Sequence, residues 1–500
     1  MKKFVEAYSD RYEEYLRDES RYTGSCEEIS FPDTVEAMAE TARECLKQGR
    51  SVTVQGARTG LCGAGVPAGG HLLSTEKLER LVSVTEEDGR TLVCVEPGMR
   101  LSALAAELAA RRSGAAFLPN PTETTATVGG AFACNAKGPN GLLYGSVGDR
   151  TAEAEILLAD GTVIKLRRGE AVLRNGACTL PDGRELRIEG LPADAGGYSG
   201  LLSLHEGEDL LDVFAGSEGM LGIVLNLTLE AGKLPSEQWG IVFFFGEEGD
   251  PLGFAEAAAG AQEEFPGDTR LAVGEYFHET ALSMVDSMRS TIQGLAALPD
   301  FPAGTRQAVY LEVCGESEDD VGEALMMLLE LFTEFGGNED DTWAGTGAAE
   351  MEKFRLLRHA APEAANVRVS EARLACREIT KLAADFTAPA ECRRELVELY
   401  ESGLAGTGLA GSIFGHVIEN RMHVNVFAGD AQEYRAGREL LASWARAVAG
   451  MGGCVISENG VGKLKRELLR ESADPGRLER ARAVKEFFDP KGLLNPGNLF

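Results

Sequence analysis

The chain has 500 residues, of which 44% are hydrophobic and 26% charged, as is typical of a soluble protein of two to four domains. The 79 acidic and 49 basic residues give a net charge of −30, which argues against nucleic acid and anionic membranes as partners. No apolar run reaches 18 residues and no secretory signal opens the chain, so we expect a cytoplasmic protein without a transmembrane segment. The ten cysteines never form CxxC, so we expect reduced thiols and no zinc ribbon, iron–sulfur cluster or disulfide framework.

The first 75 residues contain a glycine-rich loop between two predicted strands. Residues 1–30 are predicted to form an amphipathic helix and a polar turn, and a second helix runs from Phe31 to Lys47. Strands follow at 51–54 and 71–74, with glycines at 60, 63 and 65 between them. These glycines do not fit GxGxxG and no helix follows, which excludes a Rossmann loop. The loop is therefore either a nest of N–H groups for a pyrophosphate or a plain turn.

A second glycine-rich stretch, PNPTETTATVGGAFACNAKGPNGLLYGSVGDR, covers residues 119–150. It follows a predicted strand at 91–95 and a helix over RLSALAAELAARR. Glycine allows close approach of the backbone, and Thr and Asn add short donors and acceptors. The stretch is either a cradle for a large, flat, polar ligand or a long surface loop.

Strand-rich α+β structure is predicted to continue to residue 232. A hairpin over 152–166 turns at Asp160-Gly161, a strong hairpin signal. A loop-rich insert covers 168–207, and AGSEGMLGIV leads into an alternating strand, LNLTL.

From about residue 235, predicted strands and helices alternate, which favours a ferredoxin-like sheet with helices on one face. The predicted strands are 241–245, 270–277, 308–314, 378–386, 412–426 as a hairpin, and 452–456. The predicted helices are 252–264, 319–335, 346–360, one from 391, and 432–449.

Two histidines are predicted to meet in the hairpin FGHVIENRMHVN. If Glu419-Asn420 is a two-residue turn, His416 and His423 are opposite each other, with Cβ atoms about 5 Å apart. This separation suits two ligands of one divalent metal, although a plain cross-strand histidine pair fits equally well. Glu458 follows a predicted strand and is a candidate third ligand. Arg358, on a charged helix, is a candidate for binding a substrate carboxylate, although such residues are usually solvated.

The motifs together resemble a known family. QGARTGLCGAGVP, NPTETTATVGGAFACNAKGPNGLLYGS, AGSEGMLGIV, FGHVIENRMHVN, SENGVGKLK and DPKGLLNPGNLF occur in the order found in FAD-linked 2-hydroxyacid dehydrogenases of the vanillyl-alcohol oxidase / p-cresol methylhydroxylase (PCMH) superfamily. The resemblance covers residues 15–500. It implies an α+β fold, with an N-terminal segment (1–30), a two-subdomain PCMH-type FAD-binding domain (31–232), a ferredoxin-like substrate domain (235–450) and a C-terminal segment (451–500) returning to the FAD domain.

The resemblance also implies a set of residues that hold FAD without a covalent bond, since no histidine or cysteine matches the family's flavin anchors. The first loop would bind the pyrophosphate and the second would line the flavin. These expected residues are Gly56, Ala57, Arg58, Thr59, Gly60, Leu61, Pro121, Thr122, Thr125, Gly129, Gly130, Asn135, Tyr144, Gly145, Ser146, Glu218, Gly219, Gly222, Ile223 and Asn495.

In the family, residues at the positions of His416, His423 and Glu458 bind Zn, Fe or Mn, which chelates the substrate. Arg358 would neutralise the substrate carboxylate while the C2 hydride passes to flavin N5. The sequence departs from the family at Asn459, where a histidine base is usual, because asparagine cannot accept the proton. It also departs at Arg421, a cation that would suit a second substrate carboxylate.

The resemblance implies oxidation of a D-2-hydroxyacid of the D-lactate, glycolate or D-2-hydroxyglutarate class. Electrons would pass to a separate acceptor: an electron-transfer flavoprotein, an iron–sulfur subunit or a quinone pathway. A homodimer is one option for assembly. The alternatives are a flavin-holding relative of low activity, which Asn459 permits, and a redox-neutral flavin enzyme of the same superfamily.

Overall fold

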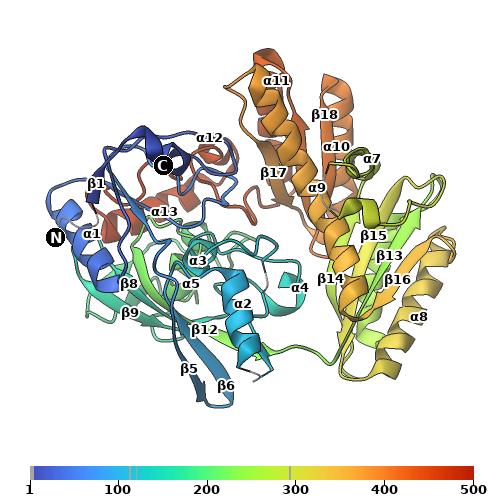
Figure 1. The fold of residues 1–500 in the computed structure, drawn as a ribbon, viewed down its shortest axis with the longest axis horizontal. Helices are drawn as coiled ribbons and strands as arrows, with labels where there is room; N and C mark the ends of the chain where they lie inside the picture. Colours follow the sequence, from blue (N-terminus) through green and yellow to red (C-terminus); the bar gives the residue numbers. More distant parts are fainter. Residues whose placement is uncertain (1–4, 112–113, 120, 292–293) are drawn as a thin grey trace. The chain divides into compact units, whose positions relative to one another are not determined.

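A computed structural model describes residues 5–111, 114–119, 121–291 and 294–500, which fold into two compact units (Figure 1). Unit 1 consists of Met1–Gly138, Tyr144–Leu234 and Ile456–Phe500, and unit 2 of Pro139–Leu143 and Pro235–Val455. Across these described residues, none of the helices is both long and apolar enough to cross a membrane.

Unit 1 contains two sheets and a small hairpin. The first sheet has the order β1-β2-β4-β3, in which only β1 is antiparallel to its neighbour. The second has the order β5-β6-β12-β8-β9 with β7 also paired to β12, and it is antiparallel throughout. The strands are β1 Val5–Ala7, β2 Glu28–Ser30, β3 Val52–Gln55, β4 His71–Ser74, β5 Leu81–Glu87, β6 Arg90–Val95, β7 Ala115–Ala116, β8 Thr151–Leu157, β9 Val163–Arg167, β10 Ala177–Thr179, β11 Glu185–Arg187 and β12 Ile223–Lys233.

The helices outside unit 2 are mostly short, and several begin at a capping side chain. Thr34 accepts a hydrogen bond from the N–H of Ala37 at the start of α1, and Asp474 caps α13, which has Pro475 at its first turn. They are α1 Val35–Lys47, α2 Leu101–Ala110, α3 Val128–Ala133, α5 Leu210–Phe214, α12 Arg466–Ser472 and α13 Pro475–Phe488, with 3-10 turns at Asp10–Leu16 and Gly200–Leu202. A further short helix, α4 Gly141–Tyr144, begins in the part of unit 2 formed by Pro139–Leu143.

The N-terminal segment differs from the predicted amphipathic helix. Residues 1–4 lie outside the described residues, and β1 pairs with β2 while only a 3-10 helix forms at Asp10–Leu16. Tyr12 and Tyr15 pack their rings against Phe31, at centroid distances of 5.5 and 5.2 Å. The prediction of an amphipathic helix was wrong. Tyr12 and Tyr15 are three residues apart, and a 3-10 helix brings residues at this spacing to one face as well as an α-helix does.

Other predictions for unit 1 are confirmed. Strands β3 and β4 flank the first glycine loop with no helix between them. The β8–β9 hairpin turns where expected, with Gly161 at φ 88° and its N–H donating to Leu158. The hairpin between β5 and β6, turning at Asp88-Gly89, was not predicted.

Unit 2 is built on a seven-stranded antiparallel sheet of order β16-β13-β15-β14-β18-β19-β17. Its strands are β13 Glu237–Phe245, β14 Arg270–Phe277, β15 Gln307–Gly315, β16 Thr342–Thr346, β17 Leu382–Thr387, β18 Ala410–His416 and β19 Arg421–Phe427. Its helices are α6 Pro251–Ala261, α7 Glu279–Ser287, α8 Glu318–Glu334, α9 Gly347–Ala375, α10 Arg393–Thr407 and α11 Ala431–Gly450, with 3-10 turns at Gln262–Glu264, Leu295–Ala297 and Ala390–Cys392.

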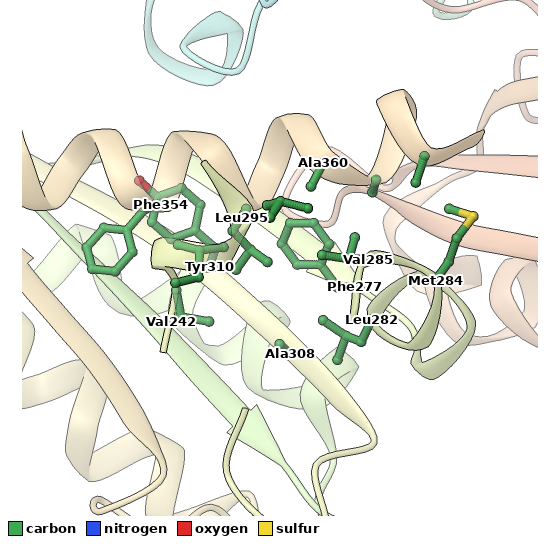
Figure 2. Packing of buried hydrophobic residues seen from close by; sticks show 14 of the residues in the cluster. Val242, Phe277, Leu282, Met284, Val285, Leu295, Ala308, Tyr310, Phe354 and Ala360 are labelled. Atoms are coloured by element: carbon green, nitrogen blue, oxygen red, sulfur yellow. The ribbon is translucent and has the colours of Figure 1, made fainter. Parts of the chain in front are cut away.

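Helices cover both faces of this sheet. Phe243 and Phe245 pack against Phe254 of α6 and Phe332 of α8. Phe244, one position along the strand, lies in a separate cluster with side chains of α7 and α9. Figure 2 shows Val242, two positions before Phe244 on β13, in this cluster with Val285 of α7 and Phe354 of α9. Successive strand residues point to opposite faces, so α6 and α8 cover one face and α7 and α9 the other. The α+β class is confirmed, but the expectation of helices on one face was wrong.

Two local predictions in unit 2 were also wrong. The β18–β19 turn has four residues, 417–420, because His416 pairs with Arg421 rather than with His423. The N–H of Val417 donates to Gly274, and the Asn420 side chain donates to Ala388, so neighbouring segments hold the longer turn. The strand predicted at 452–456 is a single bridge between Thr387 and Cys454.

Candidate functional site

The first glycine loop presents a row of backbone N–H groups. Within the described part of the chain, none of the N–H groups of residues 57–62 donates a hydrogen bond to another protein group. Arg58 and Gly63 have φ values of 64° and 76°, which turn successive N–H groups out of register with a strand. A half-buried run of this kind forms a concave donor surface for an anion.

The carbonyl groups of the same loop are held by the surrounding protein. The carbonyl oxygens of Arg58 and Gly60 accept from Glu19 and Ser20, each at 3.2 Å. Further along the loop, the carbonyl of Gly63 accepts from the Lys463 ammonium (3.3 Å), while the N–H of Gly63 donates to the Asp18 carboxylate (3.0 Å).

The two charged groups that bond to Gly63 have shifted pKa values. Burial raises the pKa of Asp18 to about 6 and lowers that of Lys463 to about 8. The loop is thus fixed through its carbonyls and the N–H of Gly63, while the N–H groups of residues 57–62 donate to no protein group in the described part of the chain.

The second glycine stretch packs directly against this loop. A Cβ added at Gly56 would lie 2.3 Å from Oγ1 of Thr127, and one at Gly129 would lie 2.7 Å from Cβ of Pro97. Both glycines are needed because no side chain fits these close approaches. Thr127 caps the six-residue helix α3 by accepting from the N–H of Gly130. The two stretches therefore meet where Gly56 contacts Thr127, whereas Gly129 packs against Pro97, just before α2.

The remaining expected cofactor residues fall into two groups. Thr122 and Thr125 are exposed on the second stretch, whereas Pro121 is buried and Tyr144 is half-buried. The polar members of the second group already bind protein: Asn135 accepts from the N–H of Gly148, Ser146 donates to Asp149, Glu218 accepts from Val461 and Gly462, and Asn495 accepts from Val54 and donates to Glu218. The others shape the backbone: a Cβ at Gly219 would contact Asn495 and one at Gly222 would contact Ile156, Gly145 takes φ 76°, and Ile223 is buried at the start of β12.

The two predicted metal histidines lie close together in unit 2, although not as direct cross-strand partners. His423 pairs with Phe414 and His416 with Arg421, so the histidines are diagonal neighbours on one sheet face. Their ring centroids are 5.6 Å apart. One ligand atom from each of His416, His423 and Glu458 lies within 4.8 Å of the others. Two imidazoles and a carboxylate at this spacing suit a divalent metal with open positions.

A buried acidic residue that the sequence reading missed adjoins this pair. Glu275 of β14 lies 3.2 Å from Nδ1 of His416 through its Oε1. Burial alone would raise the pKa of Glu275, but its interaction with His416 and the charge of Arg358 hold it below its ordinary value. A glutamate within the apolar strand LAVGEYF was the available signal, because such a buried charge requires a partner.

The polar side chains near this pair differ in whether they have a hydrogen-bond partner. Arg358 on α9 is 8% exposed, and its Nε has no hydrogen-bond partner in the part of the chain that the structure describes. Arg421 is also buried but bonds to Glu419 at 2.7 Å. Asn425, two residues after His423 and on the same face, has a buried Oδ1 without a partner in that same part of the chain, and it was not singled out from the sequence. Asn459 is half-buried.

Comparison with known families accounts for both glycine stretches. Residues 27–167 match the model described as "FAD binding domain", and residues 257–499 match "FAD linked oxidases, C-terminal domain". The chain belongs to the FAD-linked oxidases. It is therefore an FAD-dependent oxidoreductase.

Curated relatives of this FAD-linked oxidase cover almost its whole length. D-lactate dehydrogenase of Anaerostipes hadrus is 25% identical over 97% of this chain and 92% of the relative. Mitochondrial D-2-hydroxyglutarate dehydrogenase of Bos taurus is 26% identical over 95% of this chain and 76% of the relative. Among solved structures, 4-ethylphenol oxidase of Gulosibacter chungangensis has a TM-score of 0.70 over 99% of this chain and 94% of its own, at 15% identity, which supports the PCMH-type fold.

The residues of unit 1 fit FAD. The N–H groups of residues 57–62, which donate to no protein group in the described part of the chain, form the donor surface that a pyrophosphate requires. The hydrogen bonds that the carbonyls of Arg58 and Gly60 accept hold this loop in place. The close contact between Gly56 and Thr127 sets the second stretch beside it.

Proposed function

We propose that the protein oxidises a D-2-hydroxyacid to the 2-oxoacid. Support comes from the relatives named D-lactate and D-2-hydroxyglutarate dehydrogenase. The observation that carries the proposal is the group of His416, His423 and Glu458, which suits a divalent cation able to bind a hydroxyacid. When bound, FAD would supply the hydride acceptor and the cation a Lewis acid.

The chain's own residues would bind and orient the substrate and cofactors. The backbone N–H groups of residues 57–62 would donate to the FAD pyrophosphate, with the other expected cofactor residues around it. Arg358 would bind the substrate carboxylate, because its buried guanidinium has an unused donor. Asn459 can hydrogen-bond to substrate but cannot take its hydroxyl proton, so another group or solvent must accept it.

We further propose that monocarboxylic substrates such as D-lactate are preferred to D-2-hydroxyglutarate. A second substrate carboxylate at Arg421 would have to displace Glu419, which already neutralises this buried guanidinium at 2.7 Å. Removing the charge in Glu419→Gln should shift kcat/KM toward D-2-hydroxyglutarate. We take the electron acceptor to be a separate carrier protein or quinone.

The test is anaerobic reduction of the purified flavoprotein loaded with Zn²⁺, Mn²⁺ or Fe²⁺. D-lactate, glycolate, D-2-hydroxyglutarate and L-lactate are added separately, and loss of oxidised-flavin absorption is followed. We expect rapid bleaching by D-lactate, slower bleaching by D-2-hydroxyglutarate and none by L-lactate. His423→Asn should bind FAD normally and bleach far more slowly. If no hydroxyacid bleaches the flavin with any cation, the proposal is wrong and a flavin-holding or redox-neutral role is favoured.

A further inference from the structure

Each of the two histidines has a buried carboxylate on the neighbouring strand. Residues directly opposite each other in antiparallel strands point to the same face of a sheet. Glu275 of β14 is opposite His416 of β18, and Asp385 of β17 is opposite His423 of β19. Glu275 is 4% exposed and Asp385 is fully buried. The sheet therefore carries an ordered row of carboxylate, histidine, histidine and carboxylate across four adjacent strands.

The contact of Glu275 identifies the ring nitrogen that it engages. Its Oε1 lies 3.2 Å from Nδ1 of His416. An ionised carboxylate can only accept hydrogen bonds, so Nδ1 is the nitrogen that carries the proton in this contact. The lone pair of the neutral imidazole is then on Nε2.

We propose that Glu275 is a positioning residue for metal binding. It accepts the Nδ1–H of His416 and fixes the tautomer and ring orientation in which Nε2 binds a divalent cation, and Asp385 is placed by strand register to do the same for His423. This inference rests on the metal site of the proposed function. Carboxylates that orient a ligating histidine typically change metal affinity 10–100-fold when they are removed.

Glu312 supplies a matched control. It lies on β15, next to β14, and Tyr310, which is opposite Glu275, is two residues before it, so Glu312 faces the same side of the sheet. It is 2% exposed and bonds to the hydroxyl of Tyr310 and the amide of Gln238, both at 2.5 Å. Glu312→Gln therefore removes an equally buried carboxylate that serves neighbours other than a histidine.

The experiment measures the Kd of Zn²⁺ and Co²⁺ for the FAD-loaded protein, by competition with a chelator, in wild type, Glu275→Gln and Glu312→Gln. Flavin content and thermal unfolding without metal show whether each variant is folded. We expect Kd to rise 10–100-fold in Glu275→Gln, with an altered Co²⁺ spectrum, and to stay within threefold of wild type in Glu312→Gln. A Kd within threefold of wild type in Glu275→Gln, or an equal loss in both variants, overturns the inference.

Two further results keep the inference separate from the proposed function and from folding. A wild-type protein that binds neither cation overturns the proposed metal site together with this inference, whereas an unchanged Kd in Glu275→Gln overturns the inference alone. If Glu275→Gln does not fold, ¹⁵N shifts of His416 in the wild type, assigned with His416→Asn, report the tautomer directly. We expect the proton on Nδ1, and a proton on Nε2 contradicts the role given to Glu275.

Discussion

Glu218 offers a sharp test of how the C-terminal segment is attached to unit 1. Its side chain was expected to approach FAD, but Oε1 accepts from the N–H of Val461 (2.5 Å) and Oε2 from that of Gly462 (2.9 Å). Its backbone carbonyl also accepts from Asn495 (2.6 Å). We predict that Glu218→Gln loosens the segment around Val461. Glutamine has only one side-chain oxygen, so its NH₂ group would face one of the two backbone N–H donors and could not accept its hydrogen bond.

The magnitude follows from two opposing effects. Each hydrogen bond to a charged group contributes about 1.5–3 kcal/mol, so the two donors together stabilise by about 3–6 kcal/mol. Burial raises the pKa of Glu218 above its ordinary value although both N–H groups lower it, so the buried charge offsets part of this gain. We therefore expect Glu218→Gln to lower the free energy of unfolding by about 2–4 kcal/mol.

Urea unfolding of the apoprotein and limited proteolysis measure this effect, with the exposed Glu170→Gln as the control. Cleavage between residues 456 and 465 should accelerate in Glu218→Gln only. The FAD Kd of the variant is measured in parallel. An apoprotein of unchanged stability with weaker FAD binding would refute the anchoring role and return Glu218 to the cofactor site.

Three other outcomes are expected. Burial raises the pKa of Asp18 from 3.8 to about 6, so its native carboxyl binds a proton more tightly than the unfolded one. The contribution of Asp18 to stability should therefore fall by about 2 kcal/mol as the pH rises from 4 to 6, and an identical pH profile in Asp18→Asn would contradict this. Lys485→Met should cost about 3–5 kcal/mol in urea unfolding, because it leaves the fully buried Asp489 carboxylate without its cation, and Lys485→Met/Asp489→Asn should recover part of the loss. Asn459→His should raise kcat on D-lactate about 100-fold by restoring a base, and an unchanged rate would show that residue 459 is not in the proton path.

The first glycine loop shows how much the sequence alone determines. The missing GxGxxG spacing and the glycines before His71 excluded a Rossmann helix, and strand, loop, strand is what the structure contains. These are local properties of the backbone, which residue type predicts well. The partners of the loop carbonyls, Glu19 and Lys463, come from both ends of the chain, and no local pattern specifies such contacts.

The β18–β19 hairpin shows why the histidine geometry could not be predicted in full. Alternation placed both histidines on one face, but a two-residue and a four-residue turn fit the sequence equally well. The longer turn forms because Val417 donates to Gly274, on a strand 143 residues earlier. A tertiary contact thus decided the register, and it turned directly paired histidines into diagonal neighbours.

The same sheet explains why the acidic partners of the histidines were missed. Glu275 and Asp385 are far apart in the chain, and each is the only acidic residue of its strand. Sequence analysis alone therefore shows only that burying each carboxylate costs free energy, and it does not show the partner. The strand order β14-β18-β19-β17 sets them on either side of the histidines. A buried carboxylate is tolerated where it accepts from a fixed donor, and His416 provides that donor for Glu275 at 3.2 Å. The residues that looked least suited to a core are therefore those that the sheet uses to orient its polar site.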